Sequence, residues 1–429
     1  MAAKTWSRVA GTINWSDATN WNGGTVPVTT DAITFDVTSV LNCNVNALGT
    51  WASGTFTIAA SYTGTIAIQS GIAMTTAAFT QNAGTFNGDA AGSAAFTTAT
   101  IIISGGTFDF TNAGLLTTDT CLLNGTGSIK APLAWTCRYN WTVSGGTTSF
   151  THNNGTITFD GSVGGGTLTN TTSSFFKIVV NSPTQGFGVA AGTTAPFGTD
   201  PSSIVSPTIQ LNGTVTWSGT WSITGNLGLN SGATISGGTN IIVTDGSYTI
   251  NSGATIAAAF NVTMNITSST SRFFISGGKT YGNFRRTGAG SGQITFIDAV
   301  IFAGFQDNDG SVAHTLVFTI STTYTISSWS VSGVSGLLVT IISSSAGTAA
   351  TIHTTGGQVS GDYLSIKDST VDASPGWYAG ANSTNVSGNT NWIFTAAPAG
   401  VAYTGRRGRN RQISSTSKLG RRMRVRQSA

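Results

Sequence analysis

Acidic side chains are the first candidates for catalytic chemistry, and they are few and scattered. All 15 acidic residues are Asp, so the chain contains no Glu. Cleavage of a glycan generally requires two placed carboxyl groups, one often with a raised pKa. Asp362 and Asp368 flank an expected strand, which if unbroken would hold them on one face about 20 Å apart. That separation is too large for a retaining pair. We predict no catalytic residues, although a site assembled from distant segments would leave no local signal.

Candidate metal ligands show no pattern either. The densest acidic segment, Asp307-Asn308-Asp309-Gly310, lacks the Glu and the continuing ligand spacing of a Ca²⁺ loop, so we interpret it as a solvated turn. Three His have no metal spacing and no Ser/Asp arrangement, and we expect surface or ladder positions for them: His152, His314 and His353. Three Cys are expected to be reduced core or surface thiols: Cys43, Cys121 and Cys137. We predict no metal and no cofactor.

The composition indicates the elements that would have to position any site. Charged residues make up only 8% of the chain, and Lys occurs six times in 429 residues, so the charged residues typical of amphipathic helices are scarce. Thr, Val, Ile and aromatic residues favour strands, while Gly, Asn, Asp and Ser favour turns. The 56 Gly follow no three-residue period, which excludes collagen. The chain is therefore predicted to be all-β.

Short strand-turn units recur at a fixed spacing. Ala83-Gly84-Thr85-Phe86 returns as Gly105-Gly106-Thr107-Phe108, 22 residues later. The hexapeptide at 230–235 returns at 251–256 with the sequence Asn-Ser-Gly-Ala-Thr-Ile, 21 residues later. A coil of about 20 residues with Gly and Asn corners is typical of a parallel β-helix, or β-solenoid. A stack of β-sandwiches would use similar residues, but these echoes are too close for a whole sandwich.

The predicted solenoid body covers residues 41–375. Thr156-Ile-Thr-Phe159 alternates polar and apolar residues, and Ile241-Ile-Val243 is a short apolar run; both patterns occur in strands that line a core. Residues 41–370 at about 21 per coil give roughly 16 coils and a rod of about 75 Å. Four of the eight Pro lie between residues 182 and 208, which indicates a joint or a loop excursion there.

Two terminal segments differ from the repeats. The first, residues 1–40, contains Trp15 and Trp21, a Gly-Gly-Thr-Val-Pro stretch ending at Pro27, and Asp31-Ala-Ile-Thr-Phe-Asp36. The second, residues 376–397, contains Gly376-Trp-Tyr and Asn389-Thr-Asn-Trp-Ile-Phe394. Together with 151–160 and 175–182 in the interior, these motifs resemble those of β-helical surface and virion proteins of tailed phages and bacteria. The resemblance implies an extended, exposed structural or attachment protein, often trimeric.

Aromatic residues in these two segments have a structural use. An open solenoid end exposes unpaired strand edges and an apolar channel, so it must be capped. We therefore predict that large rings close the two ends: Trp15, Trp21, Trp377, Trp392 and Phe394. The alternative is that exposed Trp rings stack on sugars.

Positive charge is concentrated in residues 398–429. Nine of the 19 Lys and Arg lie between residues 406 and 426, leaving ten against 15 Asp in the rest of the chain, a net charge of about −5. We predict that this tail binds a polyanionic surface and anchors the rod to an assembly: Arg406, Arg407, Arg409, Arg411, Lys418, Arg421, Arg422, Arg424 and Arg426. Two alternatives are that the tail is simply solvated and binds nothing, or that its ligand is a nucleic acid.

These features favour a structural virion protein of a tailed phage, as a decoration, fibre or spike component. No secretory signal and no apolar run of about 18 residues is recognised, so we expect synthesis in the host cytoplasm, release within the particle, and no membrane span. Expected partners are other capsid or tail proteins, a host-surface glycan, and further copies of the chain, with a trimer favoured. A glycan-degrading tailspike enzyme and a bacterial adhesin are the rival functions.

Overall fold

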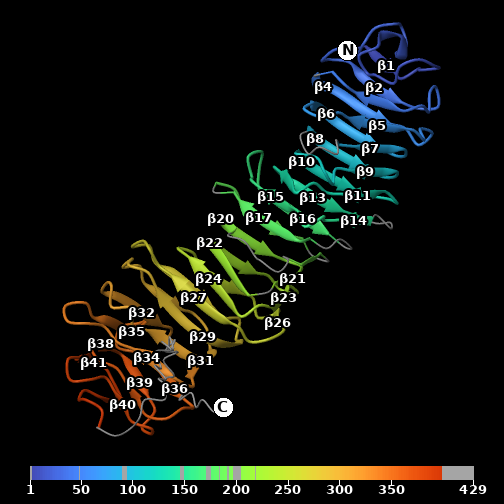
Figure 1. The fold of residues 1–429 in the computed structure, drawn as a ribbon. Helices are drawn as coiled ribbons and strands as arrows, with labels where there is room; N and C mark the ends of the chain where they lie inside the picture. The colour runs from blue at the N-terminus through green and yellow to red at the C-terminus, as the bar shows by residue number, and fades with distance from the viewer. Residues whose placement is uncertain are drawn as a thin grey trace, which may run out of the picture.

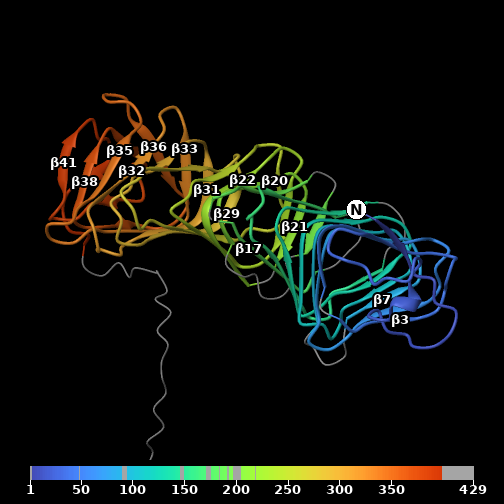
Figure 2. The same ribbon diagram turned by 90° about the horizontal axis from the view of Figure 1, so that it is seen from above.

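The computed structural model describes residues 2–47, 49–88, 94–144, 149–170, 175–182, 184–190, 193–196, 204–217 and 219–398. These residues form an elongated rod with the described termini at opposite ends (Figure 1). The rod is a β-solenoid of about 15 turns, which confirms the predicted fold class. Figure 2 shows the coils of the N-terminal part winding one behind another. The only helical segment among the described residues is a 3₁₀ turn at Ala18–Asn20, and none of their helices could cross a membrane.

One sheet runs the length of the rod, and three shorter sheets complete the coils. The strands of the long sheet are β1 Ala3–Thr5, β2 Ala32–Phe35, β4 Gly49–Ile58, β6 Ala73–Gln81, β8 Ala95–Ile103, β10 Leu115–Leu123, β12 Ala134–Cys137, β13 Asn140–Val143, β15 Thr156–Phe159, β16 Gly166–Asn170, β17 Lys177–Asn181, β18 Phe187–Val189, β20 Ile204–Leu211, β22 Thr220–Leu229, β24 Asn240–Thr244, β25 Tyr248–Ile250, β27 Asn261–Asn265, β28 Arg272–Ile275, β29 Thr280–Thr287, β30 Ile294–Phe296, β31 Val300–Asp307, β32 His314–Phe318, β33 Thr323–Ile326, β34 Trp329–Val331, β35 Val339–Ser343, β36 Ala350–Thr354, β38 Leu364–Lys367, β39 Ser369–Val371 and β41 Thr384–Ser387.

The short sheets follow one another along the chain. The first contains β3 Cys43–Val45, β5 Thr65–Ile68, β7 Thr85–Asn87, β9 Thr107–Asp109, β11 Ser128–Lys130 and β14 Ser149–Thr151. The second contains β19 Thr194–Pro196, β21 Thr214–Trp217, β23 Thr234–Gly237 and β26 Thr255–Ile256. The third contains β37 Val359–Ser360, β40 Trp377–Tyr378 and β42 Trp392–Ile393.

The sequence echoes correspond to the register of the coils. Phe86 of β7 pairs with Phe108 of β9, and Ile235 of β23 pairs with Ile256 of β26, both in parallel. Gly106, in the second echo, has a φ of +74°, and a Cβ there would lie 2.3 Å from the carbonyl oxygen of Gly84 in the preceding coil. A side chain at this corner would prevent the coils from stacking, which explains the recurring Gly-Gly-Thr turn.

The core is a continuous column of inward side chains. In β15, Ile157 and Phe159 are buried while Thr156 and Thr158 face outward, as the alternating pattern predicted. Equivalent rings of successive coils stack on one another; those of Phe296 and Phe318, for example, lie 5.0 Å apart with an interplanar angle of 10°. Because each coil contacts only its neighbours, the core grows in one dimension with chain length.

The Pro-rich segment at 182–208 does not interrupt the strand ladder of the described residues. Val180 of β17 pairs with Ile204 of β20, and Phe187 of β18 pairs with Ile209 of the same strand. The register of β20 against β22 shifts between Val205 and Thr208, which indicates a local bulge. Parallel pairing also extends beyond the predicted body, because β1 and β2 lie within residues 1–40 and β42 lies within 376–397.

Candidate functional sites

Three Trp side chains cover the N-terminal end of the core. Trp15 and Trp21 are buried, with ring centroids 4.5 Å apart in an edge-to-face arrangement, and the indole N–H of Trp21 donates to the carbonyl oxygen of Trp15 at 2.8 Å. Trp6 packs on Trp21 at 5.2 Å and stacks on Phe35 of β2 at 5.6 Å. Trp6 was absent from the predicted capping set, although it precedes the Trp15 and Trp21 motif by only nine residues.

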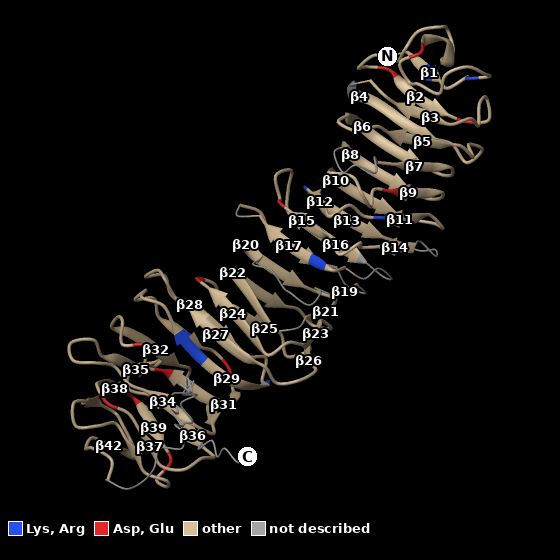
Figure 3. Ribbon diagram, viewed as in Figure 1, with Lys and Arg blue, Asp and Glu red and all other residues tan. Residues whose placement is uncertain are grey.

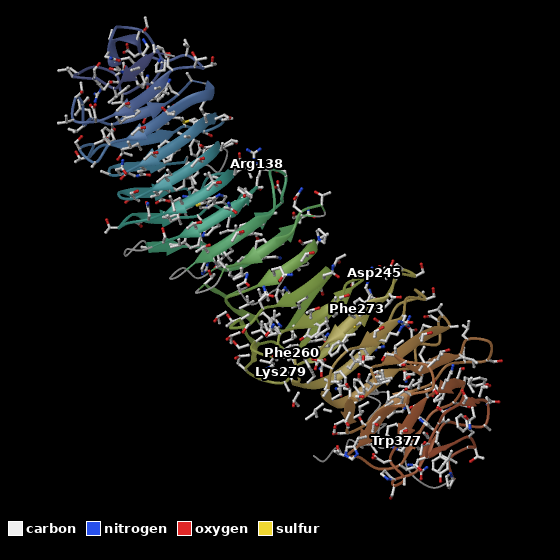
Figure 4. The ribbon with its side chains drawn as sticks, turned by 180° about the vertical axis from the view of Figure 1, so that it is seen from behind. Arg138, Asp245, Phe260, Phe273, Lys279 and Trp377 are labelled. Atoms are coloured by element: carbon white, nitrogen blue, oxygen red, sulfur yellow. The ribbon has the colours of Figure 1, made fainter. Side chains whose placement is uncertain are left out.

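A second aromatic group covers the C-terminal end. Trp377 of β40 lies at this end of the rod (Figure 4) and is buried. Its ring centroid lies 5.2 Å from that of Trp392 in β42. The indole N–H of Trp392 donates to the hydroxyl of Ser369 at 3.0 Å, and Phe394 is partly buried against the core. Since Trp15, Trp21, Trp377 and Trp392 are all buried, their rings are not surfaces on which a sugar could stack.

The surface of the rod carries little charge (Figure 3). The ion pairs of Lys130 with Asp109 and of Arg138 with Asp119 each connect neighbouring coils. All nine predicted anchoring cations, Arg406 to Arg426, lie outside the described residues.

A buried polar cluster that was not predicted from the sequence lies between β31 and β32. Asp307, at the end of β31, is fully buried, and its Oδ2 lies 2.7 Å from Nε2 of His314 at the start of β32. Nδ1 of His314 lies 2.9 Å from the carbonyl oxygen of Val312. The prediction of a solvated turn is therefore wrong for Asp307. His314 is not at the surface; it holds a ladder position, paired with Val339 of β35, and its side chain is buried. Asp307 follows buried Phe305 by two residues, so the alternation of β31 turns its side chain into the core.

Arg286 of β29 completes this cluster. Its side chain is buried, donates to the carbonyl oxygens of Gly288 and Gly290, and occupies the inward position next to Asp307 in the following coil. Burial lowers the pKa of Arg286, and the charges of Asp307 and Asp309 oppose that shift. Neither Asp307 Oδ1 nor Arg286 Nε has a hydrogen-bond partner among the described residues. Because its three residues are 95% or more buried, the cluster is suited to holding coils together rather than to acting on a substrate.

Asp362 and Asp368, and Asp372 after them, accept hydrogen bonds from residues of neighbouring coils. Asp362 accepts hydrogen bonds from the backbone N–H and the side chain of Asn382, 20 residues further on. Asp368 has a φ of +52° at the end of β38 and accepts from the N–H of Gly347. Asp372 lies 2.8 Å from Nδ1 of the half-buried His353. Each carboxylate therefore connects neighbouring coils through hydrogen bonds.

The three thiols are buried and unpaired, and we predict that they are unreactive in the folded protein. Burial raises the pKa of Cys137 to about 12 and raises those of Cys43 and Cys121 well above the usual value. At pH 8 the thiolate is therefore a very small fraction of each group. A thiol reagent such as Ellman's reagent should label native protein at less than about a hundredth of the rate seen in 6 M guanidinium chloride. Rapid labelling of native protein at pH 8 would contradict this placement.

An open groove lies on the first short sheet, near the N-terminal end. Its volume is about 470 Å³, and it is lined by Asn44, Ala67, Ile68, Gln69, Ser70, Asn87 and Gly88. Asn44 pairs with Ala67, and Ala67 pairs with Asn87, so the three residues form one column across adjacent coils. The one sequence signal for this column is the residue that follows each echo, which is Asn87 after Phe86 and Asp109 after Phe108.

The described residues contain no group of three or more His, Cys, Asp or Glu that could hold a metal ion. Comparisons with protein-family models, with curated proteins and with solved structures find no match to this chain. The fold, the charge distribution and the surface chemistry are therefore the evidence for the function of this chain.

Proposed function

We propose that this chain is a structural virion protein of a tailed phage, a decoration, fibre or spike component that projects its β-solenoid for surface attachment. The observation that carries the proposal is the separation of charge between rod and tail. Nine of the 19 cations lie between residues 406 and 426, and the ten elsewhere are outnumbered by 15 Asp. A short basic segment can engage an acidic surface that would repel the rest of the chain.

The extended shape of the rod and its covered ends support this role. A long parallel ladder with stacked aromatic rings forms a thin and extended body whose length depends on the number of coils. Trp6, Trp15 and Trp21 at one end, with Trp377 and Trp392 at the other, cover the apolar core. Covered ends oppose the edge-to-edge polymerisation to which open sheets are prone.

In this proposal the protein works without metal, cofactor or turnover. Its partners are a capsid or tail protein bound by the basic tail, a glycan on the host surface, and further copies of the chain, with a trimer favoured. The carboxylates of Asp362, Asp368 and Asp372 support a non-catalytic role, because each is engaged in turns between coils.

The test is to locate the protein in purified phage particles. Immunogold labelling with an antibody against the rod should mark one defined part of the particle, and mass spectrometry should find the chain in stoichiometric amounts. Purified rod should release no reducing sugar from host envelope polysaccharide. Unlabelled particles, or release of reducing sugars by the rod, would overturn the proposal.

A further inference from the structure

We infer that the groove on the first short sheet is a binding site for a neutral saccharide. Its volume of about 470 Å³ lies within the range of about 300–1,000 Å³ that small-ligand sites occupy. This inference supplies the proposed attachment function with a ligand class and therefore rests on that function.

A single small residue accounts for the hollow. Asn44, Ala67 and Asn87 occupy equivalent outward positions in β3, β5 and β7. Two coil steps separate the outer residues, so their side chains originate about 10 Å apart. Between them Ala67 contributes only a methyl group, which leaves the space between two amide walls open. The strands fix this geometry before any ligand arrives, which lowers the conformational entropy lost on binding.

The lining matches a sugar that carries no charge. Asn44, Gln69 and Asn87 offer amide donors and acceptors. None of the lining residues is charged, so the groove offers no counter-ion for a phosphate, sulfate or carboxylate. The methyl group of Ala67 gives an apolar floor suited to the C–H face of a sugar ring.

One lining atom itself points to a missing donor. Asn87 Oδ1 is buried and has no hydrogen-bond partner among the residues that the structure describes. Buried acceptors are almost always satisfied, because an unpaired one loses its hydration without compensation. Rotation of the Asn87 side chain towards the groove would bring this oxygen to a sugar hydroxyl that donates to it, while the sugar accepts from the neighbouring amide groups.

The position of the groove suits attachment. β3, β5 and β7 lie near the N-terminal end of the rod, whereas the described chain ends at the other end (Figure 1). A protein held at its C-terminal tail would therefore present this groove away from the particle.

The experiment measures binding of the full-length protein to a glycan array and, for the glycans bound, by calorimetry. The neutral arm holds tri- to hexasaccharides of glucose, galactose, mannose and N-acetylglucosamine, and the acidic arm holds hexuronate oligomers and sialylated oligosaccharides. We expect binding confined to the neutral arm. Ala67→Leu should weaken it at least tenfold by filling the floor, and Asn87→Ala should weaken it by removing the acceptor.

Thr65→Leu is the matched control. Thr65 faces outward from the same strand, β5, but does not line the groove, so this variant should bind as the wild type does. Equal circular dichroism spectra and thermal midpoints would show that all variants are folded. Absence of binding to the neutral arm, binding of acidic glycans alone, or wild-type affinity in folded Ala67→Leu would overturn the inference. These results leave particle incorporation untouched, so failure of the groove and failure of the virion role are distinguishable.

Discussion

Deleting residues 399–429 is expected to abolish incorporation of the protein into particles while leaving the rod folded. The deletion removes all nine cations of the tail, and no described strand or cap lies beyond Pro398. An exposed ion pair contributes only about 0–1 kcal/mol, so firm anchoring requires several pairs acting together, multiplied by the number of copies if the protein is an oligomer. The measurement is the amount of protein per purified particle, by quantitative mass spectrometry.

Two tail variants separate charge from length. Replacing the nine Lys and Arg by Gln keeps the length and should abolish incorporation, whereas replacing the eight tail Arg by Lys keeps the charge and should retain most of it. Binding of the wild type to isolated particles that lack it should weaken as salt rises, because screening shortens the range of exposed charges. A folded, truncated rod that incorporates at full occupancy would refute the anchoring role.

Replacing Asp307 by Ala is expected to destabilise the C-terminal coils by about 3–5 kcal/mol. The change removes one of the two carboxylates whose charges act on the buried Arg286, and it removes the 2.7 Å contact with Nε2 of His314. Because solenoid coils can unfold in parts, hydrogen exchange is the suitable measurement. Amide protection should fall in β29, β31 and β32 while β6, β8 and β10 stay protected.

Two comparisons identify the cause. Asn308→Ala removes an exposed neighbour of Asp307 together with its solvent-exposed hydrogen bonds to Gln306 and Ser330, and it should change stability by less than about 1 kcal/mol. The triple change Asp307→Leu, Arg286→Met and His314→Leu removes the whole polar cluster and should recover most of the lost protection, since apolar replacement of buried ion pairs is often neutral or stabilising. Equal protection in Asp307→Ala and Asn308→Ala would show that the cluster does not stabilise these coils.

The cluster also shows where local reading of the sequence failed. The segment Asp307-Asn308-Asp309-Gly310 has the composition of a solvated turn, and Asn308 and Asp309 are exposed. Asp307, however, belongs to the end of β31 and continues its inward positions after Phe305. The same alternation after Phe284 turns Arg286 inward. The alternation of the strands could have indicated that Arg286 and Asp307 are both buried. That they lie close together depends on the pairing of β29 with β31, which joins residues 21 positions apart.

The groove shows the same limit. Asn44, Ala67 and Asn87 are unremarkable in sequence, since Asn and Ala are common throughout the chain. They form a column only because β3, β5 and β7 stack in register. A small residue between two amide side chains creates a hollow only once the coils are stacked. The sequence of a single coil therefore does not predict the hollow.

The sequence by itself determined the architecture of this protein. Absence of Glu, scarcity of Lys and echoes at 21–22 residues predicted an all-β solenoid, because strand and turn preferences are local properties that every coil repeats. Only the tertiary structure decided which residues meet across coils. It buried Arg286, Asp307 and His314 together and placed Ala67 between two amides, because the register that joins residues about 20 positions apart is set by stacking of the whole column.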